Sequence, residues 1–362
     1  MSDLLCSRPH QVAKFVDQTV LPALADGSER STALKPLLKQ MAALSLFGLN
    51  IPRQFGGLEE TPEQIARTME ELSRGWMCLP SVLGSHMRAA PYILDQGTQE
   101  QKEQWLPALA SGAQIWAHGY SERRLSATGR LSTEIFESQG HYILNGQKDW
   151  VTNAADADRI LVVARHKGKT LATVIDPERK EVSLKNLERP GMRGSSLCRV
   201  QFRNYRLDQR WEVVGGFEAD VSSILAQSRI PKALAFAARA VGATRSAVTT
   251  CRKVMQARSS ECALHPVARN RWGRLLLHWE TSRVLYEAAL RGQSCPIMAK
   301  VYCGEALRKI LEEAMALLGG DGYAYPVDTL ERLYRDALAL TVAGGPNDLL
   351  LSQIADREEV FA

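Results

Sequence analysis

The cysteines are the side chains of this chain best able to bind a metal or to form covalent bridges, and their spacing argues against both roles. None of the seven belongs to a Cys-x-x-Cys pair, and they lie scattered along the chain, at Cys6, Cys78, Cys198, Cys251, Cys262, Cys295 and Cys303. An odd and dispersed set is typical of reduced thiols in a cytosolic protein, where each packs as a small apolar side chain. We therefore expect no metal site and no disulfide framework.

Net charge and hydropathy indicate which kinds of partner and which cellular location to expect. The formal net charge is +5, without a block of lysine or arginine, which argues against nucleic acid as the main partner and suits a small anionic ligand. No apolar run is long enough to span a bilayer, and the residues Met1-Ser2-Asp3 lack the basic start of a secretory signal. We expect a cytoplasmic protein without a membrane span.

Five separated segments carry the most specific patterns of the chain. In chain order they are residues 48–57 (GLNIPRQFGG), 97–112 (GTQEQKEQWLPALASG), 144–153 (LNGQKDWVTN), 190–195 (PGMRGS) and 318–337 (LGGDGYAYPVDTLERLYRDA). One such match would carry little weight. Five in this order, spread over nearly the whole chain, resemble the acyl-CoA dehydrogenase family.

The resemblance implies an α+β fold that is mostly helical and has three parts. Residues 1–112 would form an N-terminal helical domain, residues 113–212 a β-barrel or β-sandwich domain, and residues 213–362 a C-terminal four-helix bundle. The family usually assembles as a tetramer. We therefore expect a homo-oligomer, tetramer or dimer, or a mixed oligomer with a related subunit.

FAD is the cofactor that the resemblance implies. Trp150 would pack against the flavin ring, and Thr152 would make a polar contact to the edge of the ring. Tyr120 and Ser121 stand where the family has a threonine beside the flavin.

Other implied contacts concern the phosphates of the cofactor and the substrate. Arg258 resembles the arginine that reaches the flavin pyrophosphate of a neighbouring subunit, and Gly319 and Gly320 resemble the family's glycine turn at the cofactor. The loop at residues 121–128 (SERRLSAT) lacks the family's glycines and contains two additional arginines. Of these, Arg124 is expected to contact the substrate.

The reaction that the resemblance implies is oxidation of an acyl thioester, either acyl-CoA or a carrier-bound one. The thioester carbonyl acidifies its α C–H, a base removes that proton, and the β carbon transfers hydride to the flavin. Gly344, within residues 340–348 (LTVAGGPND), stands where the family carries the glutamate that acts as the base. Only a backbone N–H is left there, as a donor to the thioester carbonyl.

The family's second location for the base, on an earlier helix and immediately before an arginine, corresponds to Ser228. Serine is not a competent base at neutral pH. With both positions empty, dehydrogenation should lose a factor of about 10² to 10⁴. We expect glycine at 344 to leave a cavity for a bulkier or anionic acyl end, and a Gly344→Glu substitution to restore part of the flavin reduction.

Arg88 indicates what such an acyl end could be. It follows Gly84-Ser85-His86-Met87 on the helix that the family uses to line the acyl pocket. A buried arginine there requires an anionic partner, such as a carboxylate or sulfinate of the substrate. Arg88 and Arg124 are therefore the candidate substrate-binding residues.

Three functions are consistent with these residues. The first is an FAD-dependent oxidoreductase of the acyl-CoA dehydrogenase type with an atypical or relocated base. The second is a non-catalytic partner subunit of a mixed tetramer. The third is a non-oxidative branch of the family, such as a desulfinase that acts on an anionic acyl-CoA; a helical protein with an unrelated binding role is a further alternative.

The elements that must position these residues can be predicted from periodicity and capping. Apolar residues three and four apart predict helices over residues 33–45, 62–72, 230–248 and 274–290. Thr61 and Thr98 are predicted N-caps. Residues 160–164 and 199–202 are predicted strands, and Asn145-Gly146 is predicted to be the turn of a hairpin.

Overall fold

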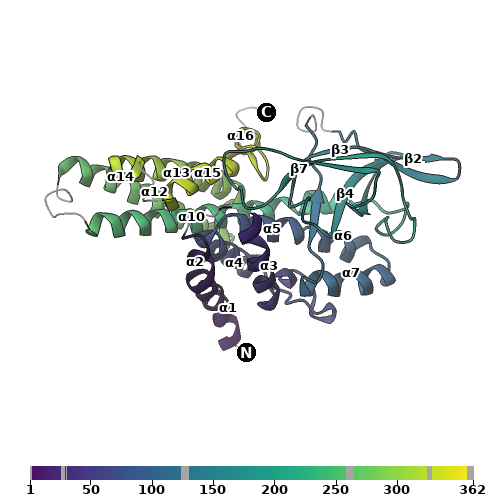
Figure 1. The fold of residues 1–362 in the computed structure, drawn as a ribbon, viewed down its shortest axis with the longest axis horizontal. Coiled ribbons are helices and arrows are strands. Elements are labelled where there is room, and N and C mark those ends of the chain that lie inside the picture. Colours follow the sequence, from purple (N-terminus) through teal and green to yellow (C-terminus); the bar gives the residue numbers. More distant parts are fainter. Residues whose placement is uncertain are drawn as a thin grey trace.

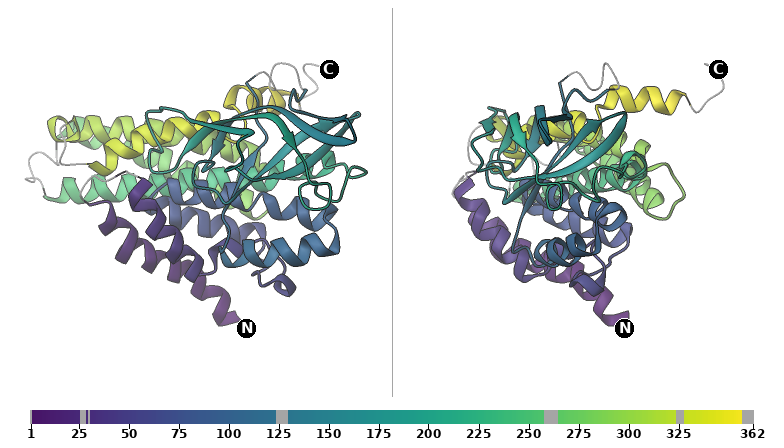
Figure 2. Two further views of the ribbon diagram at one scale, coloured as in Figure 1. Left: turned by 45° about the vertical axis from the view of Figure 1, so that its right-hand side comes forward. Right: turned by 90° about the vertical axis from the view of Figure 1, so that its right-hand side faces the viewer.

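The computed structural model describes residues 2–25, 29, 31–123, 130–257, 265–323 and 328–356. Helices, a twisted sheet and a bundle of long helices follow one another along the chain (Figure 1). The sheet lies at one end of the bundle, and the N-terminal helices lie along one side of both (Figure 2). The predicted fold class is confirmed, and the division at residues 112 and 212 is kept as a working division of the chain.

The N-terminal part is helical, as predicted. Its helices are α1 (Ser2–Phe15), α2 (Leu21–Ala23), α3 (Ser31–Ala43), α4 (Pro62–Gly75), α5 (Cys78–His86), α6 (Ala89–Gln96) and α7 (Gln99–Ser111). Both predicted N-caps are confirmed as capping boxes. Gln64 N donates to Thr61 Oγ1 over 3.3 Å and Gln101 N donates to Thr98 Oγ1 over 3.2 Å, and each glutamine side chain accepts from the backbone of its threonine.

The middle of the chain forms one sheet in the described residues. Its strands are β1 (Trp116–Gly119), β2 (Glu134–Ser138), β3 (His141–Thr152), β4 (Arg159–His166), β5 (Lys169–Ile175), β6 (Val182–Asn186) and β7 (Leu197–Arg206). They are ordered β1-β4-β2-β3-β7-β6, and β5 pairs with β4. The two predicted strands lie within β4 and β7.

The predicted turn at Asn145-Gly146 is wrong, because both residues lie inside β3. The pairing of β3 with β7 shifts register between Leu144 and Gly146, which marks a bulge. The side chain of Asn145 accepts a hydrogen bond from the backbone N–H of Asn204 across the strands, over 2.6 Å. The turn between β2 and β3 is instead at Gln139-Gly140, where both φ angles are positive.

The C-terminal part is a bundle of helices. They are α9 (Ser222–Gln227), α10 (Arg229–Ala257), α12 (Pro266–Leu290), α13 (Pro296–Leu318), α14 (Gly320–Tyr323), α15 (Asp328–Val342) and α16 (Asn347–Ala355). The predicted helices over residues 230–248 and 274–290 are confirmed and are longer than predicted. None of the described helices combines length with enough apolar character to cross a bilayer.

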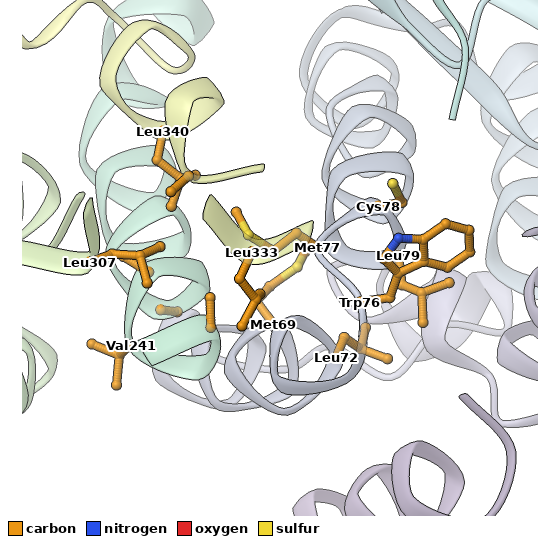
Figure 3. Close-up of a cluster of buried hydrophobic side chains, with 14 of the residues drawn as sticks. Met69, Leu72, Trp76, Met77, Cys78, Leu79, Val241, Leu307, Leu333 and Leu340 are labelled. Atoms are coloured by element: carbon orange, nitrogen blue, oxygen red, sulfur yellow. The ribbon is translucent and has the colours of Figure 1, made fainter. Parts of the chain in front are cut away.

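The largest core lies where the N-terminal helices meet the bundle. Side chains of α4 and α5 pack there against those of α10, α13 and α15 (Figure 3). Gly242 allows α10 to approach α4 closely, since a Cβ on Gly242 would overlap the carbonyl oxygen of Glu70. This contact fixes the position of α10 against the N-terminal helices.

We predict opposite effects for two helix glycines. Gly242→Ala should lower the stability by roughly 1–3 kcal/mol, because the added methyl overpacks the contact of α10 with α4. Gly273→Ala, in α12, should raise it by about 0.5–1 kcal/mol, because a Cβ there meets no atom within 4 Å and alanine favours the helix. Denaturant unfolding of both variants measures this, and a stabilising Gly242→Ala would contradict the packing described here.

Candidate functional site

Trp150 and Thr152 end β3 on a second irregular stretch. The register of β3 against β7 shifts between Lys148 and Val151, and Trp150 has a φ of +57°. Val151 is buried beneath the strand, whereas the indole of Trp150 is 49% exposed and Thr152 is partly exposed. A tryptophan in the left-handed region is uncommon, and a bulge that turns one large side chain outward is typical of a binding site.

The segment that carries Tyr120 and Ser121 is bound to this part of β3. Asp149 N donates to Ser121 O over 2.8 Å, and the carboxylate of Asp149 accepts from Arg123 N over 3.1 Å and from Arg199 Nε over 2.9 Å. These bonds hold the residues after β1 beside Trp150. The predicted neighbours of the flavin ring, Tyr120, Ser121, Trp150 and Thr152, are therefore brought together.

A buried ion pair reinforces the same segment. Lys148 Nζ lies 2.6 Å from Glu122 Oε1, and Glu122 also accepts from Ser132 and Thr133. Burial would raise the pKa of Glu122, but the ammonium of Lys148 and the hydrogen bonds outweigh this and lower the pKa to about 2. This pair is internally compensated and leaves no free charge for a ligand.

An aromatic row continues from this segment into α6. The ring of His118, on β1, stacks with the rings of Tyr120 and Tyr92, and its Nε2 lies 3.2 Å from Tyr92 Oη. Ser85 Oγ accepts from His118 N and donates to Thr152 O, so the row lies next to Thr152. Burial lowers the pKa of His118 well below its usual value, and nearby cations act in the same direction, so the imidazole is neutral.

Gly344 follows α15 and has a φ of +74°, in the region that favours glycine. A Cβ on Gly344 would lie 2.6 Å from the ring of Phe236, on α10. The predicted cavity is therefore wrong: the ring of Phe236 fills the space where the side chain of residue 344 would begin. The rescue expected from Gly344→Glu stays a prediction, but the new side chain would meet both the ring and an unfavourable backbone conformation.

The backbone around Gly344 is nonetheless well placed for a ligand. Within the part of the chain that the structure describes, the N–H of Gly344 donates no hydrogen bond. The next carbonyl, that of Gly345, accepts from Lys300 Nζ over 2.7 Å, and the same ammonium donates to Asn347 Oδ1 over 2.6 Å. Lys300 thus holds the segment while the donor at Gly344 stays available.

Three cations gather near Phe236: Arg88, which precedes α6, and Lys232 and Arg239 on α10. The guanidinium of Arg239 lies 4.5 Å from the centroid of the Phe236 ring, and a Cβ on Gly84 would overlap it. Arg239 is only 6% exposed, and its Nε has no hydrogen-bond partner. We call Arg88, Lys232 and Arg239 the cationic cluster.

The pKa values of the cationic cluster reflect burial without compensation. Burial lowers the pKa of Lys232 to about 8 and that of Arg239 to about 9, and it lowers the pKa of Arg88. Arg88 lowers the other two further by repulsion. The sequence analysis identified Arg88 and missed Lys232 and Arg239, although their spacing of seven residues places both on one face of a helix.

Several predicted residues are not brought to this site. Gly319 and Gly320 lie at the end of α13 and the start of α14, which packs on α13 and α15 at the end of the bundle far from the sheet (Figure 1). Ser228 Oγ donates to Leu225 O over 2.9 Å at the junction of α9 and α10, one turn before Lys232. Arg124 and Arg258 lie outside the described residues.

Comparison with known proteins places these features in a family. Family models match residues 9–113 (acyl-CoA dehydrogenase, N-terminal domain), 119–205 (middle domain) and 215–358 (C-terminal domain). The chain is 26% identical to a 3-(aryl)acrylate reductase of Clostridium sporogenes over 94% of each protein. It is 27% identical to a (2S)-methylsuccinyl-CoA dehydrogenase of Cereibacter sphaeroides, over 96% of this chain and 68% of the relative.

The solved structures agree on the fold. The structure of a glutaryl-coenzyme A dehydrogenase in complex with glutaryl-CoA matches with a TM-score of 0.87 and 24% identity, over 98% of this chain and 95% of the other.

We predict that the stability gained by removing the charge of Lys232 depends on pH. The pKa of Lys232 is about 8 in the folded protein and 10.5 in an ordinary lysine. Between these two pH values the unfolded protein still binds a proton on Lys232 that the folded protein has released. The stability of the wild type therefore rises as the pH increases through this window. Lys232→Met lacks this titration. Its advantage over the wild type, on the order of 2 kcal/mol below pH 8, should vanish near pH 10.5. Denaturant unfolding of both proteins at pH 7.5, 9 and about 10.5 measures the difference, and a difference independent of pH would contradict the burial of this ammonium.

Proposed function

Because the chain belongs to the acyl-CoA dehydrogenase family, we propose that it is a flavoprotein that binds FAD and acts on an acyl thioester without a carboxylate base at residue 344. The observation that carries this proposal is the environment of Gly344. Its N–H is available to the oxygen of a thioester carbonyl, while the ring of Phe236 takes the place of a side chain. The site keeps the donor and has no room for the base.

Binding of FAD is supported by the groups around Trp150. The exposed indole offers a flat apolar wall, and the partly exposed Thr152 and Tyr120 lie at its edge. The buried side-chain amide of Asn153, next to Thr152, has no hydrogen-bond partner, as expected beside a polar ligand. Trp150, Thr152, Tyr120 and Ser121 would hold the flavin ring, and bound FAD would supply the capacity to exchange a hydride with the acyl chain.

The residues of this chain would act on the thioester mainly through electrostatics. The Gly344 N–H would donate a hydrogen bond to the carbonyl oxygen and so stabilise the negative charge that develops there. The positive field of Arg239, which lies on Phe236, would stabilise the same enolate-like charge and so make the α C–H more acidic. Stacked aromatic rings from Tyr92 to Tyr120 would exclude water from this side.

The proposal includes an oligomer. Helix α14, which begins at Gly320, is far from strand β3, which carries Trp150, so a cofactor that contacts both elements would lie between two copies of the chain (Figure 1). Large apolar side chains are exposed on the bundle, namely Leu277 and Val284 on α12, Val342 on α15 and Leu351 on α16. Such surfaces are typical of protein interfaces. A mixed oligomer, in which this chain supports the site of a related subunit, is the alternative that the missing base favours.

Trp150→Ala should weaken FAD binding about tenfold, because the flavin ring loses its stacking partner. Phe136→Ala is the matched control, since Phe136 lies on the neighbouring strand β2 and is 40% exposed. Titration of the apoprotein with FAD, followed by flavin fluorescence, measures both. Equal effects of the two variants would contradict the role of Trp150, and wild-type protein that binds no FAD would favour the partner-subunit alternative.

Gly344→Glu alone should not increase reduction of the flavin, because the new side chain meets the Phe236 ring and a φ of +74°. Combining it with Phe236→Ala makes room, so the double variant should be reduced faster by a simple acyl-CoA than either single variant. Anaerobic bleaching of the flavin absorbance is the measurement.

Gly344→Ala with Phe236→Ala carries the same backbone strain without a carboxylate and serves as the control. Rapid bleaching of the Gly344→Glu single variant would show that Phe236 does not exclude a base.

A further inference from the structure

We infer that the cationic cluster of Arg88, Lys232 and Arg239 is a subsite for the anionic end of the acyl group, so that the substrate is an acyl thioester with a terminal carboxylate or sulfinate. This inference rests on the proposed function and names the class of substrate for that site. It is carried by the lack of negative charge around three neighbouring cations and by their place beside Gly344.

The cations of the cluster lack the partners that other arginines of the chain have. Within the described residues, no carboxylate pairs with Arg88, Lys232 or Arg239, and their side chains make no hydrogen bond. By contrast, Arg67 meets both carboxylate oxygens of Glu287, at 2.5 and 2.7 Å. A partly buried arginine elsewhere in the chain is thus compensated, whereas the cations of the cluster are not.

Arg239 is buried, and Arg88 and Lys232 are partly buried. A cation held away from water without a partner is costly, and cations near one another also repel. Taking a charge out of water is unfavourable unless a partner of opposite sign replaces the water, and like charges add to the cost in a medium of low dielectric constant. Repulsion from Arg88 acts on both Lys232 and Arg239. An arrangement of this kind is reasonable if a ligand supplies the negative charge during function.

The geometry places this missing charge next to the thioester site. Arg239 lies on the ring of Phe236, and the same ring contacts the position of the Gly344 side chain. Arg88 has no carboxylate partner within the described residues. Its positive charge interacts with the hydroxyl of Tyr92, which lies 3.2 Å from His118 Nε2 in the aromatic row. The cluster therefore lies between Gly344 and the segment beside Trp150, where an acyl chain starting at Gly344 would extend.

The residue types fit an oxyanion at the end of a chain. A guanidinium donates two parallel N–H groups to a carboxylate, and a lysine adds a third donor that can adjust its position. A sulfinate presents the same negative oxygens. A neutral acyl end would leave Arg239 buried without a counter-charge and would cover the partly exposed Arg88 and Lys232, so the site should discriminate against it.

The test compares thioesters that differ only in this charge. Isothermal titration of the purified flavoprotein with glutaryl-CoA and succinyl-CoA, and with the corresponding ω-amides, separates the anionic end from length and from the CoA moiety. We expect the carboxylates to bind at least about tenfold more tightly than the amides, the range of a charge-assisted hydrogen bond. A terminal sulfinate of the same length, measured in parallel, distinguishes the two oxyanions.

Two variants assign the preference to the cluster. Arg88→Met and Arg239→Met should each reduce the carboxylate preference about tenfold, and Arg88→Lys should retain part of it. A second readout does not depend on any ligand: Arg88→Met should raise the melting temperature of the substrate-free protein, because it removes an uncompensated charge. Arg67→Met is the matched control and should lower the melting temperature, because it leaves Glu287 without its partner.

The outcomes separate this inference from the proposed function. Equal binding of carboxylates and amides by the wild type would overturn the inference and leave the proposed function intact. A preference that survives both methionine variants would also overturn it, since the anion would then bind elsewhere. Failure of every thioester to bind would overturn the proposed function itself.

Discussion

The position of α10 determines where the groups of the candidate site lie. Gly242 brings this helix into close contact with the backbone of α4, and the core in Figure 3 fixes α13 and α15 against it. Lys232, Phe236 and Arg239 are spaced so that they share one face of α10. Because α15 ends at Val342, the left-handed turn at Gly344 meets that face directly, and the ring of Phe236 separates the turn from Arg239.

The chain treats buried charge in two different ways. Next to Trp150, Lys148 and Glu122 form an ion pair, and the carboxylate of Glu122 also accepts hydrogen bonds from Ser132 and Thr133. Both carboxylate oxygens of Asp149 likewise accept hydrogen bonds. Such a network is rigid and holds a binding surface in place. The cationic cluster is not compensated in this way. We propose that this costs the free protein some stability and that a ligand supplies the missing negative charge.

The packing around residue 344 agrees with the proposal that no carboxylate base stands there. A glutamate at 344 would need a backbone that tolerates a side chain and space beside α10, and this chain has a positive φ and a phenylalanine there. Two consecutive glycines and the ammonium of Lys300 stabilise the turn in this form. The backbone, Phe236 and Lys300 therefore all fit a glycine at residue 344, so that more than one residue would have to change to accommodate a glutamate there.

Features that depend on local interactions or on long, ordered patterns could be predicted from the amino-acid sequence. The capping boxes at Thr61 and Thr98 involve residues three apart, and the long helices follow from apolar periodicity, so both could be predicted. The five family segments likewise predicted the order of helices, sheet and bundle. The family resemblance also implied that Trp150, Thr152, Tyr120 and Ser121 lie beside one flavin ring.

Features that depend on residues distant in the chain could not be predicted in this way and are seen first in the folded protein. Asn145-Gly146 has the composition of a turn, but pairing with Asn204 on β7 makes it a bulge inside β3. Whether Gly344 leaves a cavity depends on Phe236, more than a hundred positions earlier, and whether an arginine is compensated depends on what packs around it. Neither spacing nor composition records such contacts, because they arise when helices and strands pack together.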